Sequence, residues 1–436
     1  MSFARSIVGL VGSLLLLVRN LHGLLTTDEE QLLTPVIPGI NLPTSQFPYL
    51  ALALLLNVCL HEAGHAIAAA ADDMVINSVG FFFITFVPGG AYVDVKNLEM
   101  ASMYRRLKVS AAGAWHNIWV FAFCLLAMAV LPVVLAPVYV LGEGAAVVHV
   151  NAAGPVAAHL HAGDVITAVN GCQVRSVGDW RECYLSVLRD ERAGFCAPSS
   201  VVGELAANGE HCCQEEYRGV MQCMRTSAPM CTPGNDTAVD QTPRTVAAGF
   251  RQDAGVCSPV RPWLDGARCS TAAECSVDAS SECATCLRPS FTRDVDRLVV
   301  VTFRHAPSER HGVVGAVDND HLDDVLLYAG HPAQVWHDID VIDYQPRMSL
   351  PLPLDLPRMI ERFFMFTGSL ATALALLNLA PVYKLDGEET TTCLLALLLP
   401  PARFPRLLPF VRESLLWFGT ILLVANLVLS HVFLFI

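Results

Sequence analysis

Two histidines and a glutamate lie together in the segment His61-Glu62-Ala-Gly-His65. On a helix, residues four apart project from the same face, so both imidazoles can hold one Zn²⁺ ion. Glu62 then lies beside the metal without ligating it, where it can accept a proton from a zinc-bound water. The spacing predicts a hydrolytic zinc site with His61 and His65 as metal ligands and Glu62 as the general base.

A catalytic zinc needs a third protein ligand, and the candidate is Asp386, at the end of the segment Asn378-Leu-Ala-Pro-Val-Tyr-Lys-Leu-Asp-Gly387. Taken alone, an Asp-Gly pair is most often a simple turn. However, His65 and Asp386 both fall at the cytosolic ends of their apolar segments in the topology that the loop charges indicate. The two motifs are therefore expected at the same membrane depth.

The composition indicates where such a site lies. Hydrophobic residues make up 53% of the 436 residues and charged residues only 16%, against roughly 25% in an ordinary soluble chain. The formal net charge of −13 argues against a polyanionic partner, because phosphate contacts need clustered Lys and Arg. This excludes a purely cytosolic enzyme, a disordered chain and a nucleic-acid binder, and predicts an α-helical multi-pass membrane protein.

Four apolar runs are long enough to cross a bilayer, which takes about 20 residues: 47–71, 107–141, 363–380 and 415–436. A weaker run at 6–18 is either the apolar segment of a signal peptide or a first span. No Ala-x-Ala-like cleavage site follows it, which favours an uncleaved span.

Loop charges set the orientation of these spans. Basic residues precede two of the spans and acidic residues precede the span with the histidines: Arg105, Arg106, Lys108, Arg403, Arg406 and Arg412, against Asp28, Glu29 and Glu30. By the positive-inside tendency, segments 75–108 and 384–412 are cytosolic. The polar stretch 142–356 is then lumenal.

Cysteine usage agrees with that orientation. Twelve of the fifteen cysteines lie between Cys172 and Cys286, a density typical of disulfide bonds in an oxidising compartment. A zinc-binding cluster is the alternative, because Cys283-Ala-Thr-Cys286 has the C-x-x-C spacing. Asn235-Asp-Thr in the same stretch is a glycosylation sequon.

An aromatic and β-branched stretch follows the histidines. Segments 79–87 and 91–95, separated by Pro88-Gly-Gly, predict a β-hairpin with its turn at that tripeptide. It is either an ordinary membrane-lying hairpin or a sheet edge that receives an unwound substrate strand.

The joint pattern of these motifs resembles the site-2 protease family of intramembrane zinc metalloproteases. The resemblance rests on His61-Glu-Ala-Gly-His65 in a span, the distant N-x-x-P-x-x-x-L-D-G, and Gly113-Ala-Trp-His-Asn117, which is similar to the family's G-x-x-x-N. It implies His61, His65 and Asp386 as zinc ligands, water in the fourth position, and Glu62 as the base. It further implies that Asn378 helps to position the substrate backbone or its oxyanion.

The lumenal stretch resembles a PDZ domain with a Cys-rich insertion, as in eukaryotic site-2 proteases. The resemblance rests on the strand-like 144–150, on Gly163-Asp164-Val-Ile, on the hairpin signal Asn170-Gly171 and on a returning strand at 297–304.

The expected fold is a three-helix catalytic core with accessory helices, a membrane-adjacent hairpin and this lumenal domain. The expected domains follow the chain: an N-terminal span and short lumenal loop (1–46), the first half of the catalytic core (47–141), the PDZ-like domain (142–356) with its insertion (172–290), the second half of the core (357–399) and a C-terminal span (400–436).

The expected function is that of a zinc-dependent intramembrane endopeptidase with one Zn²⁺ per chain. The resemblance implies cleavage of a transmembrane helix in membrane-tethered transcription factor precursors, single-span or type II proteins of the Golgi or endoplasmic reticulum, after a first lumenal cut. Two alternatives stay open: a zinc or ion transporter that uses intramembrane His and Asp ligands, and a proteolytically silent chaperone relative, against which the intact Glu62 argues.

Overall fold

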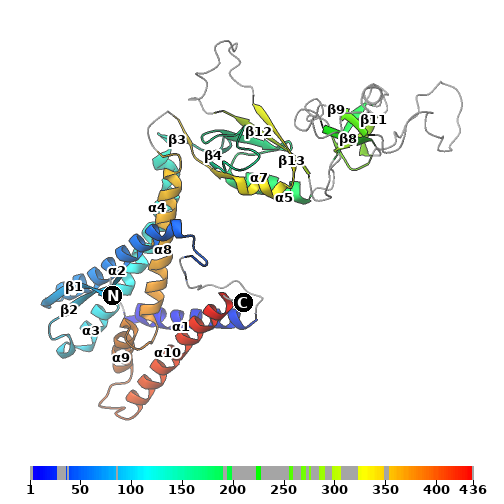
Figure 1. The fold of residues 1–436 in the computed structure, drawn as a ribbon. Coiled ribbons are helices and arrows are strands. Elements are labelled where there is room, and N and C mark those ends of the chain that lie inside the picture. Colours follow the sequence, from blue (N-terminus) through cyan, green and yellow to red (C-terminus); the bar gives the residue numbers. More distant parts are fainter. Residues whose placement is uncertain are drawn as a thin grey trace, which may run out of the picture. The chain divides into compact units, whose positions relative to one another are not determined.

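A computed structural model describes residues 3–26, 36, 39–84, 87–189, 194–198, 222–226, 255–258, 267–271, 274–275, 284–289, 297–305, 323–347 and 353–434. The chain divides into two compact units. The helical unit comprises Met1–Val134 and Arg358–Ile436, and the β unit comprises Leu135–Pro357. Figure 1 shows the elements of both units.

Five helical segments in the described residues are long and apolar enough to cross a membrane, as the composition predicts. They are α1 (Phe3–Thr26), α2 (Phe47–Ala70), α3 and α4 (Met103–Ser110 and Ala112–Leu135), α8 (Leu356–Leu379) and α10 (Leu407–Leu434). The weak run at 6–18 lies inside α1, and the run at 107–141 is interrupted at Ala111 and ends at Leu135.

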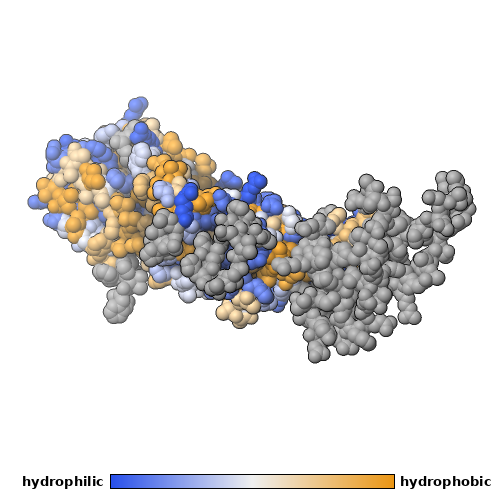
Figure 2. Space-filling view, turned by 90° about the horizontal axis from the view of Figure 1, so that it is seen from above, coloured by the Kyte–Doolittle hydropathy of each residue, from blue (hydrophilic) through white to orange (hydrophobic). Residues whose placement is uncertain are grey.

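Large apolar side chains remain exposed on these helices. On α4, Trp119 and Val133 are 71% and 72% exposed, and on α10 Phe410 is 70% exposed. Figure 2 shows broad apolar areas on the molecular surface. Such surface is costly in water and suits contact with lipid.

Buried amides hold the helices together. The Asn57 side chain on α2 donates to the carbonyl of Thr367 on α8 at 3.0 Å, and Asn20 on α1 donates to Asn426 on α10 at 2.9 Å. Between apolar helices such bonds contribute about 0.6–2 kcal/mol each. The first of them fixes α2 one turn before His61.

The predicted hairpin is present, but its turn was predicted at the wrong place. Strands β1 (Ile76–Ile84) and β2 (Val87–Val95) pair antiparallel, with Pro88 opposite Phe83 and Gly90 opposite Phe82. The Pro-Gly-Gly tripeptide therefore lies within β2, where a register shift between Phe82 and Phe83 takes up the extra residue. Glycine suits a bulge as well as a turn, and the sequence did not distinguish the two.

The β unit contains a six-stranded antiparallel sheet in the order β13-β12-β5-β4-β14, with β6 paired to β5. Its strands are β4 (Ala145–Val150), β5 (Val165–Val169), β6 (Cys172–Gln173), β12 (Arg297–Arg304), β13 (Asp324–Gly330) and β14 (Ile339–Ile342). Helices α5 (Val177–Arg189) and α7 (Pro332–Asp338) pack against it, with the Trp180 and Trp336 rings stacked at 6.1 Å. Strands β3 (Tyr139–Val140) and β15 (Gln345–Pro346) form a separate pair.

Residues 172–189, which the sequence assigned to the Cys-rich insertion, pack with this six-stranded sheet. The buried faces of Trp180, Cys183 and Tyr184 join its hydrophobic core, and a disulfide links Cys172 to Cys183. The structure does not by itself identify the sheet as a PDZ domain, so that interpretation stays a prediction.

A second, five-stranded sheet lies further along the Cys-rich stretch, in the order β10-β7-β11-β8-β9. Its strands are β7 (Gly194–Pro198), β8 (Gln222–Thr226), β9 (Gly255–Ser258), β10 (Arg268–Cys269) and β11 (Ala284–Pro289). Disulfides Cys196–Cys275 and Cys269–Cys286 support it.

The cysteines of the two units are in different chemical states. Among the described side chains, six cysteines of the β unit form disulfides, whereas Cys59, Cys124 and Cys393 of the helical unit are free thiols. This favours disulfides over zinc for those six. The other six cysteines of the cluster have side chains outside the described region of the chain.

Candidate metal centre

Helix α2 brings the two histidines together as their spacing predicts. The helix runs unbroken for 24 residues from Phe47, with a proline in its first turn. The His61 and His65 rings lie edge to face with centroids 4.8 Å apart, and both residues are buried, at 6% and 8% exposure. Buried histidines in an apolar helix need a polar partner.

Asp386 is that partner, although it lies 321 residues beyond His65 in the chain. It is the first residue of α9 (Asp386–Leu398), and its Oδ2 is 2.8 Å from His61 Nε2 and 3.1 Å from His65 Nε2. The two Nε2 atoms are 3.2 Å apart. The three donor atoms thus converge, so that these three residues together could hold a metal ion.

The donor set fits a zinc ion. Two imidazole nitrogens and one carboxylate oxygen form the three-ligand set of many catalytic zinc sites. In a tetrahedron with bonds of about 2.1 Å, ligand atoms lie about 3.4 Å apart, close to the 2.8–3.2 Å observed. Small side-chain rotations would complete the fit.

Gly113 on α4 lies directly against this convergence point. A Cβ atom at Gly113 would be 2.4 Å from His65 Nε2 and 2.6 Å from His61 Nε2. Both distances are shorter than atoms of that kind tolerate, so any larger residue would enter the space where the donor atoms meet. This close approach explains why the first residue of Gly113-Ala-Trp-His-Asn117 is a glycine.

The other ring nitrogen of each histidine also has a partner. His65 Nδ1 lies 2.8 Å from the carbonyl of Val109, so Nδ1 carries the proton and Nε2 keeps its lone pair for a metal. His61 Nδ1 lies 3.3 Å from the Asn117 amide, whose Oδ1 is buried without a partner. Rotating the Asn117 amide by 180° lets Oδ1 accept from His61 Nδ1–H, which satisfies both groups.

Glu62 lies next to the donor atoms and interacts with the hairpin. Its carboxylate accepts a hydrogen bond from the backbone of Val93 on β2. The side chain is therefore held between α2 and β2, beside the centre but outside the three-donor group.

Asn378, the remaining candidate, and His116 of α4 both lie outside the three-donor group. Asn378 is half-buried in the last turn of α8, and within the described residues its side chain makes no hydrogen bond. The Nδ1 atom of His116 lies 2.9 Å from the carbonyl of Ala112, and its ring lies against Gly64.

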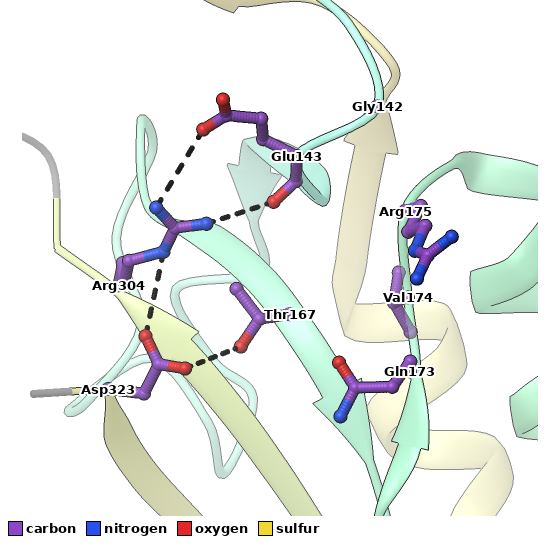
Figure 3. A pocket seen from close by; sticks show the side chains of 8 residues that line it. All are labelled: Gly142, Glu143, Thr167, Gln173, Val174, Arg175, Arg304 and Asp323. Carbon is purple, nitrogen blue, oxygen red and sulfur yellow. Dashed lines mark hydrogen bonds and ion pairs between the residues drawn. The ribbon is translucent and has the colours of Figure 1, made fainter. Parts of the chain in front are cut away.

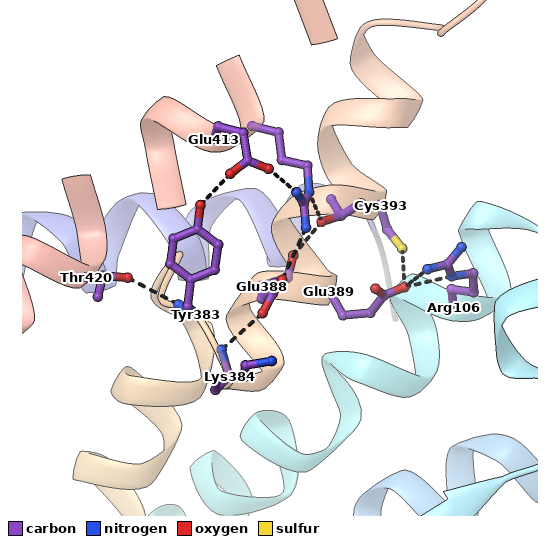
Figure 4. Close-up of polar contacts among 10 residues, drawn as sticks. Arg106, Tyr383, Lys384, Glu388, Glu389, Cys393, Glu413 and Thr420 are labelled. Atoms are coloured by element: carbon purple, nitrogen blue, oxygen red, sulfur yellow. Dashed lines mark hydrogen bonds and ion pairs between the residues drawn. The ribbon is translucent and has the colours of Figure 1, made fainter. Parts of the chain in front are cut away.

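A charged network fixes the helix that carries Asp386 (Figure 4). Glu388, in the first turn of α9, accepts from the Lys384 backbone at 3.0 Å and pairs with Arg412 of α10 at 3.2 Å. Glu389 accepts from Arg106 Nε of α3 at 2.6 Å. Acidic side chains at a helix N-terminus also interact favourably with its dipole.

Gly387 is required by the turn that leads into α9. A Cβ there would lie 1.6 Å from the carbonyl oxygen of Ala380, so no other residue fits. The chain thus folds back tightly between α8 and α9, and this close return brings Asp386 to α2.

Helix α3 links both halves of the site, a role that sequence reasoning missed. Its Val109 carbonyl orients His65, its Arg106 holds α9, and Lys108 pairs with Asp72 after α2 at 2.6 Å. In the sequence, Arg106 and Lys108 indicate only the topology of the spans. The one signal in the sequence is the pair of glutamates directly after Asp386-Gly387, which indicates that basic side chains lie near the start of α9.

A polar pocket of about 370 Å³ lies in the β unit (Figure 3). The Arg304 guanidinium within it faces Asp323 at 3.5 Å and Glu143 at 3.9 Å. None of the residues predicted to bind metal lines this pocket.

Comparisons with known proteins agree with this geometry. The model of peptidase family M50 matches residues 49–401, which include α2, α4, α8 and α9. The chain belongs to peptidase family M50. It is 26% identical over 381 residues to the membrane-bound transcription factor site-2 protease homolog of Arabidopsis thaliana, covering 81% of this chain and 71% of that protein. It is also 27% identical over 149 residues to an uncharacterised protein of Methanocaldococcus jannaschii, covering 34% and 35% of the two chains.

Membership of M50 confirms the resemblance to the site-2 protease family and supports a metalloprotease. The five apolar helices and the membrane-bound relative support a multi-pass membrane protein. The transporter interpretation is not favoured, because a peptidase family covers the segments that carry the His and Asp ligands.

Proposed function

We propose that this chain is a zinc-dependent endopeptidase that cleaves transmembrane helices within the bilayer. The observation that carries the proposal is the convergence of three donor atoms within 2.8–3.2 Å: those of His61 and His65, on a helix apolar enough to span a membrane, and that of Asp386, at the start of α9. His61, His65 and Asp386 would hold one Zn²⁺, and Gly113 leaves the space for it.

When bound, zinc supplies a Lewis acid that polarises a carbonyl oxygen and acidifies water. Glu62 accepts the proton of the attacking water and passes it to the leaving amine, so that the peptide bond breaks into a carboxylate and an amine. Val109 and Asn117 hold the imidazole tautomers that leave both Nε2 atoms free. Asn378, an amide with no partner in the described chain, is proposed to hold the substrate backbone or its oxyanion.

The edge of β2 is proposed as the substrate-binding strand. In an antiparallel pair, successive residues point their backbone groups alternately toward and away from the neighbouring strand. Val93 bonds to Glu62, so Val93 and, by alternation, Ala91 and Val95 face away from β1. An unwound substrate segment that pairs with this edge would present an extended peptide bond beside Glu62.

The proposed substrates are membrane-tethered transcription factor precursors, single-span or type II, already cut once on the lumenal side. Support comes from the name of the Arabidopsis relative and from the disulfides of the β unit, which suit an oxidising lumen. We therefore propose a Golgi or endoplasmic reticulum location, with the centre toward the cytosol and residues 142–356 lumenal. A PDZ-like β unit would exclude substrates with uncleaved bulky ectodomains.

Glu62→Gln tests the proposal. The purified full-length variant should lose proteolysis of a model membrane substrate by about 10²–10⁴-fold and keep its zinc, because Glu62 supplies no donor atom. Glu361→Gln, a neutralised carboxylate in α8 outside the centre, is the matched control and should cleave normally. Turnover by Glu62→Gln above a few per cent of wild type would remove the assigned base.

A further inference from the structure

A second cluster of histidine and aspartate side chains lies in the β unit, outside the centre described above. One donor atom each from His161, Asp164 and His305 lies within 4.8 Å of the others. His161 and Asp164 directly precede β5, and His305 follows β12. Since these strands pair, with Arg304 opposite Val165, the three residues meet at one end of the sheet.

Asp164 is the centre of the cluster. Its side chain is completely buried, although an isolated buried carboxylate is unstable without a cationic or donor partner. Oδ1 lies 3.1 Å from His305 Nδ1, and Oδ2 accepts from the His161 backbone at 2.8 Å and lies 4.0 Å from His161 Nδ1. The backbone of Asp164 is fixed as well, because its carbonyl accepts from Val147 of β4 at 2.8 Å.

His305 is oriented like a metal ligand. Its Nδ1 lies 3.1 Å from Asp164 Oδ1, and its Nε2 lies 3.0 Å from the Asp324 carboxylate at the start of β13, so with a metal ion on Nδ1 the Nε2–H group would donate to Asp324. A carboxylate behind a histidine is the common outer partner of protein metal sites. The Phe303 ring, edge-on at 5.0 Å, holds the imidazole in place.

The charges of the cluster suit a divalent cation. With both imidazoles bound as neutral ligands, the carboxylates of Asp164 and Asp324 would balance the charge of a divalent ion. Imidazole nitrogen with carboxylate oxygen is a donor set that zinc and similar transition metals bind.

We propose that His161, Asp164 and His305 form a second binding site for a divalent transition metal, Zn²⁺ in the first instance, with Asp324 orienting His305. The site is built by the sheet of the β unit and uses none of the ligands of the M50 centre. Water would complete the coordination.

Metal counting in the full-length protein tests this proposal independently of catalysis. In a chain that carries His61→Ala and Asp386→Ala, we expect one zinc per protein after equilibration with Zn²⁺ and removal of free metal. Adding His305→Ala should reduce the count to zero, whereas His159→Ala, an exposed histidine two residues before His161, should leave it at one. Zero zinc in the starting variant, or one zinc retained after His305→Ala, would overturn the site.

Asp324→Asn provides a second test if His305→Ala disturbs folding. It leaves the three inner donors in place and should weaken zinc affinity about 10–100-fold, as measured by competition with a chelator. Unchanged zinc affinity would contradict the proposed role of Asp324. Mass spectrometry that finds the disulfides intact is the control that the β unit of the variant is folded.

Discussion

The two His-His-Asp clusters of this chain are built on different scaffolds. In the helical unit, the donors are 2.8–3.2 Å apart, both histidines are buried, and Gly113 leaves open the space where the donor atoms meet. In the β unit, the donors lie within 4.8 Å, and the His161 and His305 side chains are 47% and 36% exposed. Helix packing yields a tight, enclosed site, whereas strand ends yield a looser and more accessible one.

The outer partners differ in the same way. Backbone and amide groups orient the helical-unit histidines, through Val109 and Asn117. A charged carboxylate, Asp324, orients His305. In an apolar helix bundle a further charge would be costly, whereas at a solvated sheet end it is not. We therefore expect the helical-unit site to tolerate less change than the β-unit site.

Removing the carboxylate ligand should have the largest effect. Asp386→Ala should lower zinc occupancy of the centre and eliminate cleavage, a loss on the order of a thousandfold or more, because two imidazoles alone leave the ion incompletely held. Asp164→Ala, the matched change in the other cluster, should leave the centre's zinc and its activity unaltered. Normal zinc content and normal cleavage in Asp386→Ala would reopen the search for the third ligand.

Adding a single methyl group at Gly113 should have the second-largest effect on activity. Gly113→Ala puts a Cβ within 2.6 Å of both Nε2 atoms and should cost about a hundredfold in kcat/KM through displaced ligands. Gly12→Ala on α1, where a Cβ meets nothing within 4 Å, is the control and should be silent. Equal activity of the two variants would show that the space beside Gly113 is not needed.

Removing the side chain that orients His61 should have a smaller effect, and this effect falls on zinc affinity. Asn117→Leu removes the acceptor for Nδ1–H and should weaken zinc affinity of the centre about 10–100-fold. Asn117→Asp keeps an acceptor and should restore most of that affinity. If both variants bind zinc like the wild type, Asn117 serves packing alone.

Reduction should affect the two units unequally and have the smallest effect on the centre. Breaking Cys172–Cys183 and the other disulfides should destabilise the β unit by about 2–4 kcal/mol per bond, while the free thiols Cys59, Cys124 and Cys393 have no bond to lose. Alkylation without reductant, read by mass spectrometry, should spare the cysteines between 172 and 286. Labelling of most of them would refute the disulfide interpretation.

Local periodicity determined the portion of the site that lies within one helix. His61, Glu62 and His65 could be placed from their spacing because a helix repeats every 3.6 residues whatever surrounds it. The membrane spans were predictable for a similar reason, since their length and apolarity are set by the bilayer rather than by the rest of the fold. The hairpin was predicted correctly as an element, but its turn was predicted at the wrong residues, because Gly89-Gly90 suits both a turn and a bulge.

Only the tertiary structure decided what completes each cluster. Asp386 was a candidate by motif, but its place against His61 and His65 depends on the close return before α9 and on α3, which binds both α2 and α9. The second cluster left no signal in the sequence, because His161 and Asp164 meet His305 only through the pairing of β5 with β12. Strand pairing and helix packing join residues over a hundred positions apart, and no local periodicity encodes which residues they join.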